Sequence, residues 1–161
     1  MDRLLLDTTY LLPLFGVDVK LQRFEELLPK LLEGFDTLYN PISLVEAKWL
    51  ILRLMRRSKP RAEGLLEAYR RGLKALQFDE RLKPTALTEP EVEEIADRLL
   101  VEAGLRDYFD RLIYASAIVN DALLLTEDEE LREIASRGRH PHPRGIMNWR
   151  EMIERLEGLR G

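Results

Sequence analysis

Two short leucine runs, each followed closely by an aspartate, constrain the fold more than any other feature of this sequence. Leu4-Leu5-Leu6 precedes Asp7, and residues 122–125 precede Asp128. A run that is apolar at every position indicates a strand buried on both faces, as in a parallel sheet that helices cover on each side. Two weaker strand candidates are residues 37–39 and 146–147.

Longer stretches with apolar residues at helical spacing separate these strand candidates. The predicted helices are residues 9–15, 18–33, 43–57, 60–76, 88–103, 108–120, 126–136 and 149–159, and residues 77–87 are irregular or a weak strand. Gly34 is expected to end the second helix. Strands that alternate with helices predict an α/β fold with a mostly parallel sheet. A chain of 161 residues suits one domain, residues 1–161.

Composition excludes several kinds of active site. The chain contains no cysteine and two histidines, which excludes disulfide frameworks, thiolate nucleophiles, cysteine-bound zinc and multi-histidine metal sites. Its formal net charge of −4 means that a polyanionic partner has to meet a local basic patch or a bound metal ion. Asp7 interrupts the N-terminal apolar run, and no stretch approaches the ~18 apolar residues of a membrane span. We therefore expect a cytoplasmic protein with no membrane segment.

Carboxylates stand where a layered α/β fold would gather them, namely at Asp7, Glu46, Asp110 and Asp128. Asp7 and Asp128 follow buried strands, and the carboxyl ends of parallel strands share one edge of the sheet. Glu46 and Asp110 fall in the first turns of predicted helices, whose N-termini point to that same edge. These acids, although distant in sequence, are therefore expected to converge in one pocket.

Each of these acids also has a structural alternative, because short polar side chains cap helices and form capping boxes. The alternatives are an N-cap at Asp7, a box of Ser43 with Glu46, a box of Thr126 with Glu129, and an N-cap at Asp107 on the helix that carries Asp110. Capping alone does not require acids both after the two buried strands and at the two helix starts, so their joint pattern favours a shared site.

Convergence of several carboxylates has an energetic cost that points to a ligand. Two like charges ~4 Å apart repel by about 4 kcal/mol at an effective dielectric constant of ~20. Such groups cannot all stay ionised without a counter-charge or raised pKa values. Oxygen-only ligands select a hard cation, Mg²⁺ or Mn²⁺, and these ions serve phosphodiester cleavage by activating water and neutralising transition-state charge.

Four segments of the sequence resemble the PIN-domain nucleases. They are residues 4–9 (Leu-Leu-Leu-Asp-Thr-Thr), 43–46 (Ser-Leu-Val-Glu), 110–117 (Asp-Arg-Leu-Ile-Tyr-Ala-Ser-Ala) and 124–128 (Leu-Leu-Thr-Glu-Asp), in the order of the family. The run that begins at Asp110, with Thr-x-Asp after a short buried strand, is the most specific of these signals. In size and layout the chain is most similar to the VapC-type toxins of prokaryotic toxin–antitoxin pairs.

The resemblance implies a three-layer α/β/α sandwich and an Mg²⁺- or Mn²⁺-dependent endoribonuclease. It implies that Asp7, Glu46, Asp110 and Asp128 form the catalytic and metal-binding quartet, with the Thr126 hydroxyl beside the metal. A homodimer and a co-encoded antitoxin that inserts a segment near the acidic pocket are also implied. In our hypothesis Asp7 and Asp110 bind the metal directly, whereas Glu46 and Asp128 complete the cage or hold metal-bound waters.

Charge is divided unevenly along the chain. Residues 53–74 hold eight basic and two acidic side chains, whereas residues 89–110 hold eight acidic and two basic ones. Because an acidic pocket repels RNA, the basic stretch is the predicted RNA contact, although any one arginine could belong to an ordinary solvated helix. Its densest part consists of Arg53, Arg56, Arg57, Lys59 and Arg61.

The tryptophans and histidines are expected to be structural. Trp49 and Trp149 occupy apolar helical positions, which favours packing in the core or in an interface over stacking on a base. His140 and His142 are expected in a solvated loop rather than on a metal ion.

Several functional alternatives stay open at this point. A non-catalytic PIN-like module that binds RNA or a protein would share the fold, and a housekeeping RNA-processing nuclease would share the site. An aspartyl-phosphate enzyme is disfavoured because the segment after Asp7 lacks a second aspartate two residues on. A nucleotide-dependent kinase or dehydrogenase is disfavoured because no glycine-rich phosphate loop is present.

Overall fold

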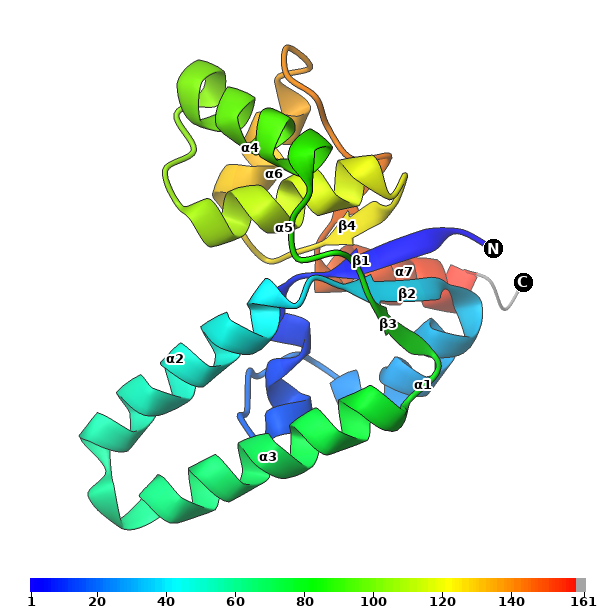
Figure 1. Cartoon of the computed structure of the whole chain (residues 1–161). Coiled ribbons are helices and arrows are strands. Elements are labelled where there is room, and N and C mark those ends of the chain that lie inside the picture. The colour runs from blue at the N-terminus through cyan, green and yellow to red at the C-terminus, as the bar shows by residue number, and fades with distance from the viewer. Residues whose placement is uncertain (159–161) are drawn as a thin grey trace.

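A parallel sheet lies between layers of helices in the computed structural model, which describes residues 1–158 (Figure 1). The strands are β1 (Arg3–Leu6), β2 (Asp36–Tyr39), β3 (Leu82–Pro84), β4 (Leu123–Leu125) and β5 (Gly145–Met147). The α-helices are α1 (Phe24–Gly34), α2 (Ile42–Arg57), α3 (Ala62–Phe78), α4 (Pro90–Ala103), α5 (Tyr108–Val119), α6 (Glu129–Ser136) and α7 (Trp149–Gly158). Short 3₁₀ turns are η1 (Thr8–Tyr10), η2 (Leu12–Phe15) and η3 (Lys59–Arg61). The ends of the predicted terminal helix and of the predicted domain, residues 159–161, lie outside the described residues.

Every strand pair is parallel, and the order across the sheet is β3-β2-β1-β4-β5. β1 is the central strand, where Leu5 pairs with Leu38 of β2 on one side and with Leu124 of β4 on the other. Just past the strands, the Asp7 N–H still donates to the Leu125 carbonyl at 3.0 Å. The chain therefore leaves β1 and β4 at one common edge of the sheet.

Alternation of side chains along β1 divides the core into two. Leu4 and Leu6 pack on one face with side chains from α1, α3 and α7, whereas Leu5 packs on the other face with α4, α5 and α6. All three leucines are at most 1% exposed. A strand that is apolar at every position is what a sheet covered on both faces requires. The predicted three-layer α/β/α class is confirmed.

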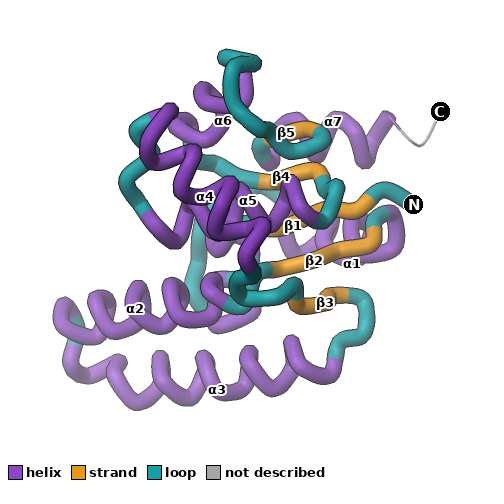
Figure 2. Tube along the Cα trace, turned by 45° about the horizontal axis from the view of Figure 1, so that its top comes forward, coloured by secondary structure: helices purple, strands orange, loops and turns teal. Residues whose placement is uncertain are grey.

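Helices α2 and α3 run side by side as an antiparallel hairpin that projects beyond the sheet (Figures 1 and 2). The tip of the hairpin is η3, and Pro60 stands in its first turn. Near the sheet, the Tyr69 hydroxyl of α3 donates to the Leu44 carbonyl of α2 at 2.8 Å. No helix in the described part of the chain, these two included, is long and apolar enough to cross a membrane.

The segment between β1 and β2 departs most from the sequence prediction. Residues 9–15 form the 3₁₀ turns η1 and η2 rather than one helix. The helix predicted from residue 18 begins at Phe24, because Lys20 and Arg23 adopt positive φ angles that interrupt helical geometry. Its predicted end at Gly34 is confirmed.

Close packing of α3 on η2 depends on Gly72. A Cβ added at Gly72 would lie 2.2 Å from the Leu14 carbonyl oxygen, so the two elements would have to separate. We expect Gly72→Ala to lower the free energy of unfolding by about 1–3 kcal/mol. Urea unfolding followed by circular dichroism measures this loss.

Gly64 offers a matched control on the same helix, because a Cβ there meets nothing within 4 Å. Gly64→Ala should raise the free energy of unfolding by up to about 1 kcal/mol. Equal stability of the two variants would contradict the close approach of α3 to η2.

Candidate functional site

Asp7 lies at the centre of the candidate site. It is 7% exposed, and its two carboxylate oxygens accept separate hydrogen bonds. Oδ1 accepts from the Thr8 N–H at 2.7 Å, and Oδ2 accepts from the Thr126 hydroxyl at 2.6 Å. Burial raises the pKa of Asp7; the two hydrogen bonds oppose that rise, and the negative charges of Asp128 and Asp107 add to it. Since Thr126 follows β4, its bond joins the ends of two neighbouring strands at a buried carboxylate.

The start of α2 is bonded to the same loop. Ser43 lies inside the first turn of α2, and its hydroxyl accepts from the Thr8 hydroxyl at 2.9 Å. The alternative in which Ser43 and Glu46 form a capping box is wrong, because α2 already begins at Ile42 and has no side-chain cap. Ser43 instead fixes the first turn of α2 beside the carboxyl end of β1.

Glu46 is half-buried one turn further along α2. Its pKa is raised to about 7, first by burial and then by the negative charges of Asp7 and Asp107, while Thr8 and Arg53 oppose the shift. A carboxyl group with this pKa is only partly ionised near neutral pH.

Asp110 lies in the first turn of α5, whose N-cap is Asp107. The Asp107 carboxylate accepts from the N–H groups of Phe109 at 2.9 Å and Asp110 at 3.1 Å. The pKa of Asp110 is raised to about 8, by burial first and then by negative charges. In order of effect, those charges belong to Asp107, Asp7, Asp128 and Glu46. The other three members of the predicted quartet, Asp7, Glu46 and Asp128, are therefore within electrostatic reach of Asp110.

Asp128 joins the cluster from the start of α6. It is the N-cap of that helix, and its Oδ1 accepts from two N–H groups of the first turn at 2.9 and 3.4 Å. Its own N–H donates to the Thr126 hydroxyl oxygen at 3.0 Å. The alternative in which Thr126 boxes with Glu129 is wrong, because the N-cap of α6 is Asp128 rather than Thr126.

Two contributors to the site were not assigned a role there from sequence. Asp107 was considered only as a cap, yet its charge is the first of the neighbouring charges that raise the pKa of Asp110. Asn40 is fully buried at the end of β2, where its Oδ1 accepts from the Ile42 N–H at 2.9 Å and its Nδ2 donates to the Ser116 hydroxyl at 2.7 Å. Asn40 thus links the start of α2 to α5. The sequence signal that could have identified Asp107 was an acid at a predicted helix start. The signal for Asn40 was a polar residue directly after a predicted strand.

No basic side chain forms an ion pair with the acidic cluster in the described chain. The cluster consists of Asp7, Glu46, Asp107, Asp110 and Asp128, and none of these residues takes part in an ion pair within residues 1–158. In that same range no three acidic or histidine side chains stand in an arrangement that would enclose a metal ion. Mg²⁺ keeps several waters and commonly uses one or two carboxylates. The donor set therefore suits a hydrated hard cation better than a closed cage.

The densest part of the predicted basic stretch lies along the outer half of α2 and at the tip η3 (Figure 1). Its members are exposed and form no ion pair among the described residues; they are Arg53, Arg56, Arg57, Lys59 and Arg61. Arg53 lines a hollow of about 380 Å³ together with Glu46. The structure therefore brings Arg53 to the acidic cluster and spreads the others along the hairpin.

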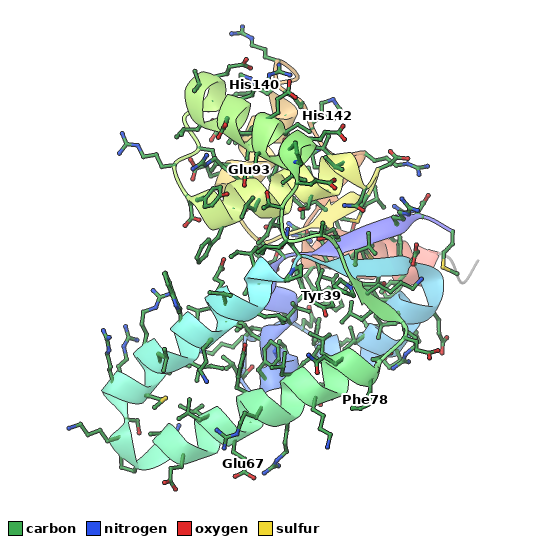
Figure 3. All side chains as sticks on the ribbon, viewed as in Figure 1. Tyr39, Glu67, Phe78, Glu93, His140 and His142 are labelled. Carbon is green, nitrogen blue, oxygen red and sulfur yellow. The ribbon has the colours of Figure 1, made fainter. Side chains whose placement is uncertain are left out.

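His140 and His142 lie in the loop between α6 and β5, on the side of the molecule that carries α4 and α6 (Figure 3). His140 Nδ1 is 3.4 Å from a carboxylate oxygen of Glu102, and His142 Nδ1 is 2.9 Å from the Pro143 carbonyl. Neither histidine contributes to the acidic cluster.

The two tryptophans have different environments. Trp149 is buried, and its indole N–H donates to the Gln22 carbonyl at 2.8 Å, so its predicted core role is confirmed. Trp49 is 57% exposed, so the core alternative is wrong for it, while packing in an interface stays a prediction. Its ring packs against Phe109 with centroids 5.4 Å apart.

Comparison with known proteins places the chain in a family. The family model of the PIN domain matches residues 4–137, so the chain belongs to the PIN domain family. The crystal structure of VapBC2 from Rickettsia felis bound to a DNA fragment from their promoter contains a chain with this fold. That chain has a TM-score of 0.62 and 20% identity, and the match covers 91% of this chain and 98% of that one. The structure of FitAB bound to the IR36 DNA fragment gives a TM-score of 0.54 and 17% identity over 91% of this chain and 94% of that chain. No curated protein matches the chain in sequence.

The raised pKa values make the stability of the metal-free protein depend on pH. Glu46 and Asp110 titrate at about 7 and about 8 in the folded protein, against ordinary values of 4.5 and 3.8. The folded state therefore holds these protons more tightly than the unfolded chain does. Their ionisation should lower the free energy of unfolding as the pH rises from about 4 to about 8.

Urea unfolding in EDTA at about pH 5 and about pH 8 measures this loss. Asp110→Asn should reduce it and should be more stable than the parent at the higher pH by on the order of 1 kcal/mol. Asp97→Asn removes an exposed carboxylate of α4 and should leave the pH profile unchanged. Identical profiles for the parent and Asp110→Asn would contradict the electrostatic coupling of the cluster.

Proposed function

We propose that this PIN-domain protein is a divalent-metal-dependent endoribonuclease that hydrolyses RNA phosphodiester bonds. The observation that carries the proposal is the acidic cluster. It brings five carboxylates together, and none of them forms an ion pair with a basic side chain among residues 1–158. Such an arrangement is unfavourable unless protons or a cation neutralise it. Membership of the PIN domain family agrees with a hydrolytic role for these groups.

The proposed cofactor is Mg²⁺ or Mn²⁺, and Asp7, Glu46, Asp110 and Asp128 are proposed to hold it directly or through its bound waters. Carboxylate oxygens are the donors that these hard cations prefer. When bound, the ion supplies Lewis-acid activation of water and neutralises charge on the phosphodiester oxygens. The hydrogen bonds from Thr8 and Thr126 hold the Asp7 carboxylate in one orientation, which preorganises it as a ligand and makes Thr126 a positioning residue.

We further propose that the protein is the toxin of a VapBC-type pair, and that it acts in the cytoplasm as a homodimer with a cognate antitoxin. The support for this role is the fold shared with chains of the VapBC2 and FitAB complexes. A short neighbouring reading frame that encodes a small DNA-binding protein would strengthen the toxin role. Its absence would favour a housekeeping RNA-processing nuclease with the same chemistry.

Replacing Asp7 with asparagine tests the catalytic assignment. Asp7→Asn removes one negative charge and keeps the side-chain shape, so cleavage of single-stranded RNA in Mn²⁺ should fall by about 100-fold or more. A gel assay with an end-labelled RNA measures this rate. Asp97→Asn is the control and should cleave as the parent does.

Metal binding gives a second readout that does not depend on turnover. Mn²⁺ should raise the thermal midpoint of the parent protein, because a ligand that binds only the folded state stabilises it, and it should have little effect on Asp7→Asn. A fully active Asp7→Asn variant would refute the assignment of Asp7. RNA binding by the parent without any metal-dependent turnover would instead favour a non-catalytic module.

Phosphate contacts along the hairpin predict strong salt dependence of RNA binding. The double variant Arg56→Ala/Arg57→Ala should weaken binding uniformly across RNA sequences and reduce the slope of log K against log salt by ~0.7 for each lost phosphate contact. Fluorescence anisotropy in EDTA at several salt concentrations measures the slope.

The control for this double variant is Arg139→Ala, which removes an exposed arginine from the loop that carries the histidines. It should leave the affinity and the slope unchanged. If Arg139→Ala weakened RNA binding as much as the double variant did, the contact would be diffuse and the assignment to the basic stretch would be wrong.

A further inference from the structure

A hollow of about 380 Å³ opens directly beside the acidic cluster, between α2 and the start of α5. It is lined by Glu46, Trp49, Arg53, Asp107, Tyr108 and Phe109. Two of these residues, Glu46 and Asp107, belong to the acidic cluster. Whatever occupies the hollow is therefore adjacent to a phosphate held at that cluster. Its volume lies in the lower part of the range of ~300–1,000 Å³ that small-molecule sites occupy.

The wall of the hollow is aromatic, and it faces solvent. Trp49 is 57% exposed and Tyr108 is 42% exposed, although large aromatic side chains are usually well buried. The Trp49 and Phe109 rings are tilted by 50° with centroids 5.4 Å apart, so Trp49 is held in place from one side. The Tyr108 hydroxyl donates to Glu93, which anchors the other end of the wall.

Beyond Glu46 and Trp49, α2 carries basic side chains that border the hollow. Arg53 lines it, and Trp49 and Arg53 also line an adjoining hollow of about 250 Å³ with Leu52 and Arg56. Both arginines are exposed and form no ion pair among residues 1–158. Glu46, Trp49 and Arg53 therefore follow one another along α2.

We propose that this hollow binds the nucleobase next to the scissile phosphate of an unpaired RNA strand, with Trp49 as the stacking surface and Arg53 on the following phosphate. Stacking needs a base that is not already stacked in a duplex, so the site selects single-stranded segments. The inference rests on the proposed nuclease function and extends it, because it makes Trp49 a determinant of which RNA is bound.

Charge favours RNA over a protein segment as the occupant. An apolar peptide would bring no charge to Arg53 and Arg56, whereas each phosphate of a strand that runs along α2 supplies a negative one. Arginine beside an exposed indole is also a common arrangement for single-stranded nucleic acid, because base stacking and cation–π contact act together.

Trp49→Leu tests the proposal by removing the ring and keeping an apolar side chain. Binding is measured in EDTA by anisotropy of a labelled adenylate oligonucleotide of about six nucleotides, for which Trp49→Leu should bind roughly 10-fold more weakly. Trp49→Phe should recover most of the affinity. Inorganic polyphosphate has charge and no base, so its inhibition constant should be the same for both variants and the parent.

The control is Phe78→Leu, which removes an exposed ring at the end of α3 (Figure 3) and should leave RNA affinity unchanged. Indole fluorescence supplies a direct signal, because Trp149 is buried and the oligonucleotide should quench Trp49 alone. Parent-like RNA affinity in Trp49→Leu would overturn the proposal and would leave the hollow to a protein partner.

Cleavage assays in Mn²⁺ separate this inference from the proposed function. If the parent cleaves RNA and Trp49→Leu binds as the parent does, the base site is wrong and the nuclease stands. If the parent binds RNA through Trp49 and does not cleave it in any divalent ion, the base site stands and the nuclease function is wrong.

Discussion

The hydrogen bond from the Thr126 hydroxyl to Asp7 is the interaction on which the candidate site depends. It joins the ends of β1 and β4, the two strands whose leucines fill both cores, and it fixes one oxygen of a buried carboxylate at 2.6 Å. The same hydroxyl accepts from the Asp128 N–H, so α6 starts from this point as well. The other Asp7 oxygen is held by the Thr8 N–H. A buried carboxylate is therefore held at this edge of the sheet, and the remaining acids lie around it.

The helices bring further negative charge to that carboxylate and place most of the predicted basic side chains further out. α2 contributes Glu46, and the start of α5 contributes Asp107 and Asp110. Burial first, and then the repulsion between these acids, raises the pKa values of Glu46 and Asp110 to about 7 and about 8. Apart from Arg53, which lines the hollow beside the acids, the predicted basic residues lie further out on the projecting hairpin (Figure 1). The acids therefore repel one another at the edge of the sheet, and the basic side chains beside them can attract a negatively charged ligand. A polyanion accompanied by a divalent cation would satisfy both regions, which is the physical basis of the proposed function.

Sequence reasoning predicted elements where one local signal was strong. The leucine runs predicted β1 and β4, and the pattern after Asn40 predicted α2 nearly to its ends. It was wrong where several weak signals competed. Lys20 and Arg23 adopt positive φ angles that nothing in the local pattern indicates, so α1 starts later than its periodicity predicts. Trp49 has the spacing of a core residue, but it lies on a face of α2 that no described element covers fully, and spacing alone cannot show which faces remain open.

The sequence by itself determined the class of fold and the chemistry available to it. Strands that are apolar at every position require helices on both sides, and a chain with scattered carboxylates and no cysteine has oxygen donors to offer a metal. Only the tertiary structure decided which acids act on one another, that Asp107 joins them, and that Arg53 and an open aromatic wall stand next to them. Electrostatic coupling depends on distances between side chains that meet through folding. Those distances follow from how helices pack on a sheet, and residue spacing along the chain does not contain them.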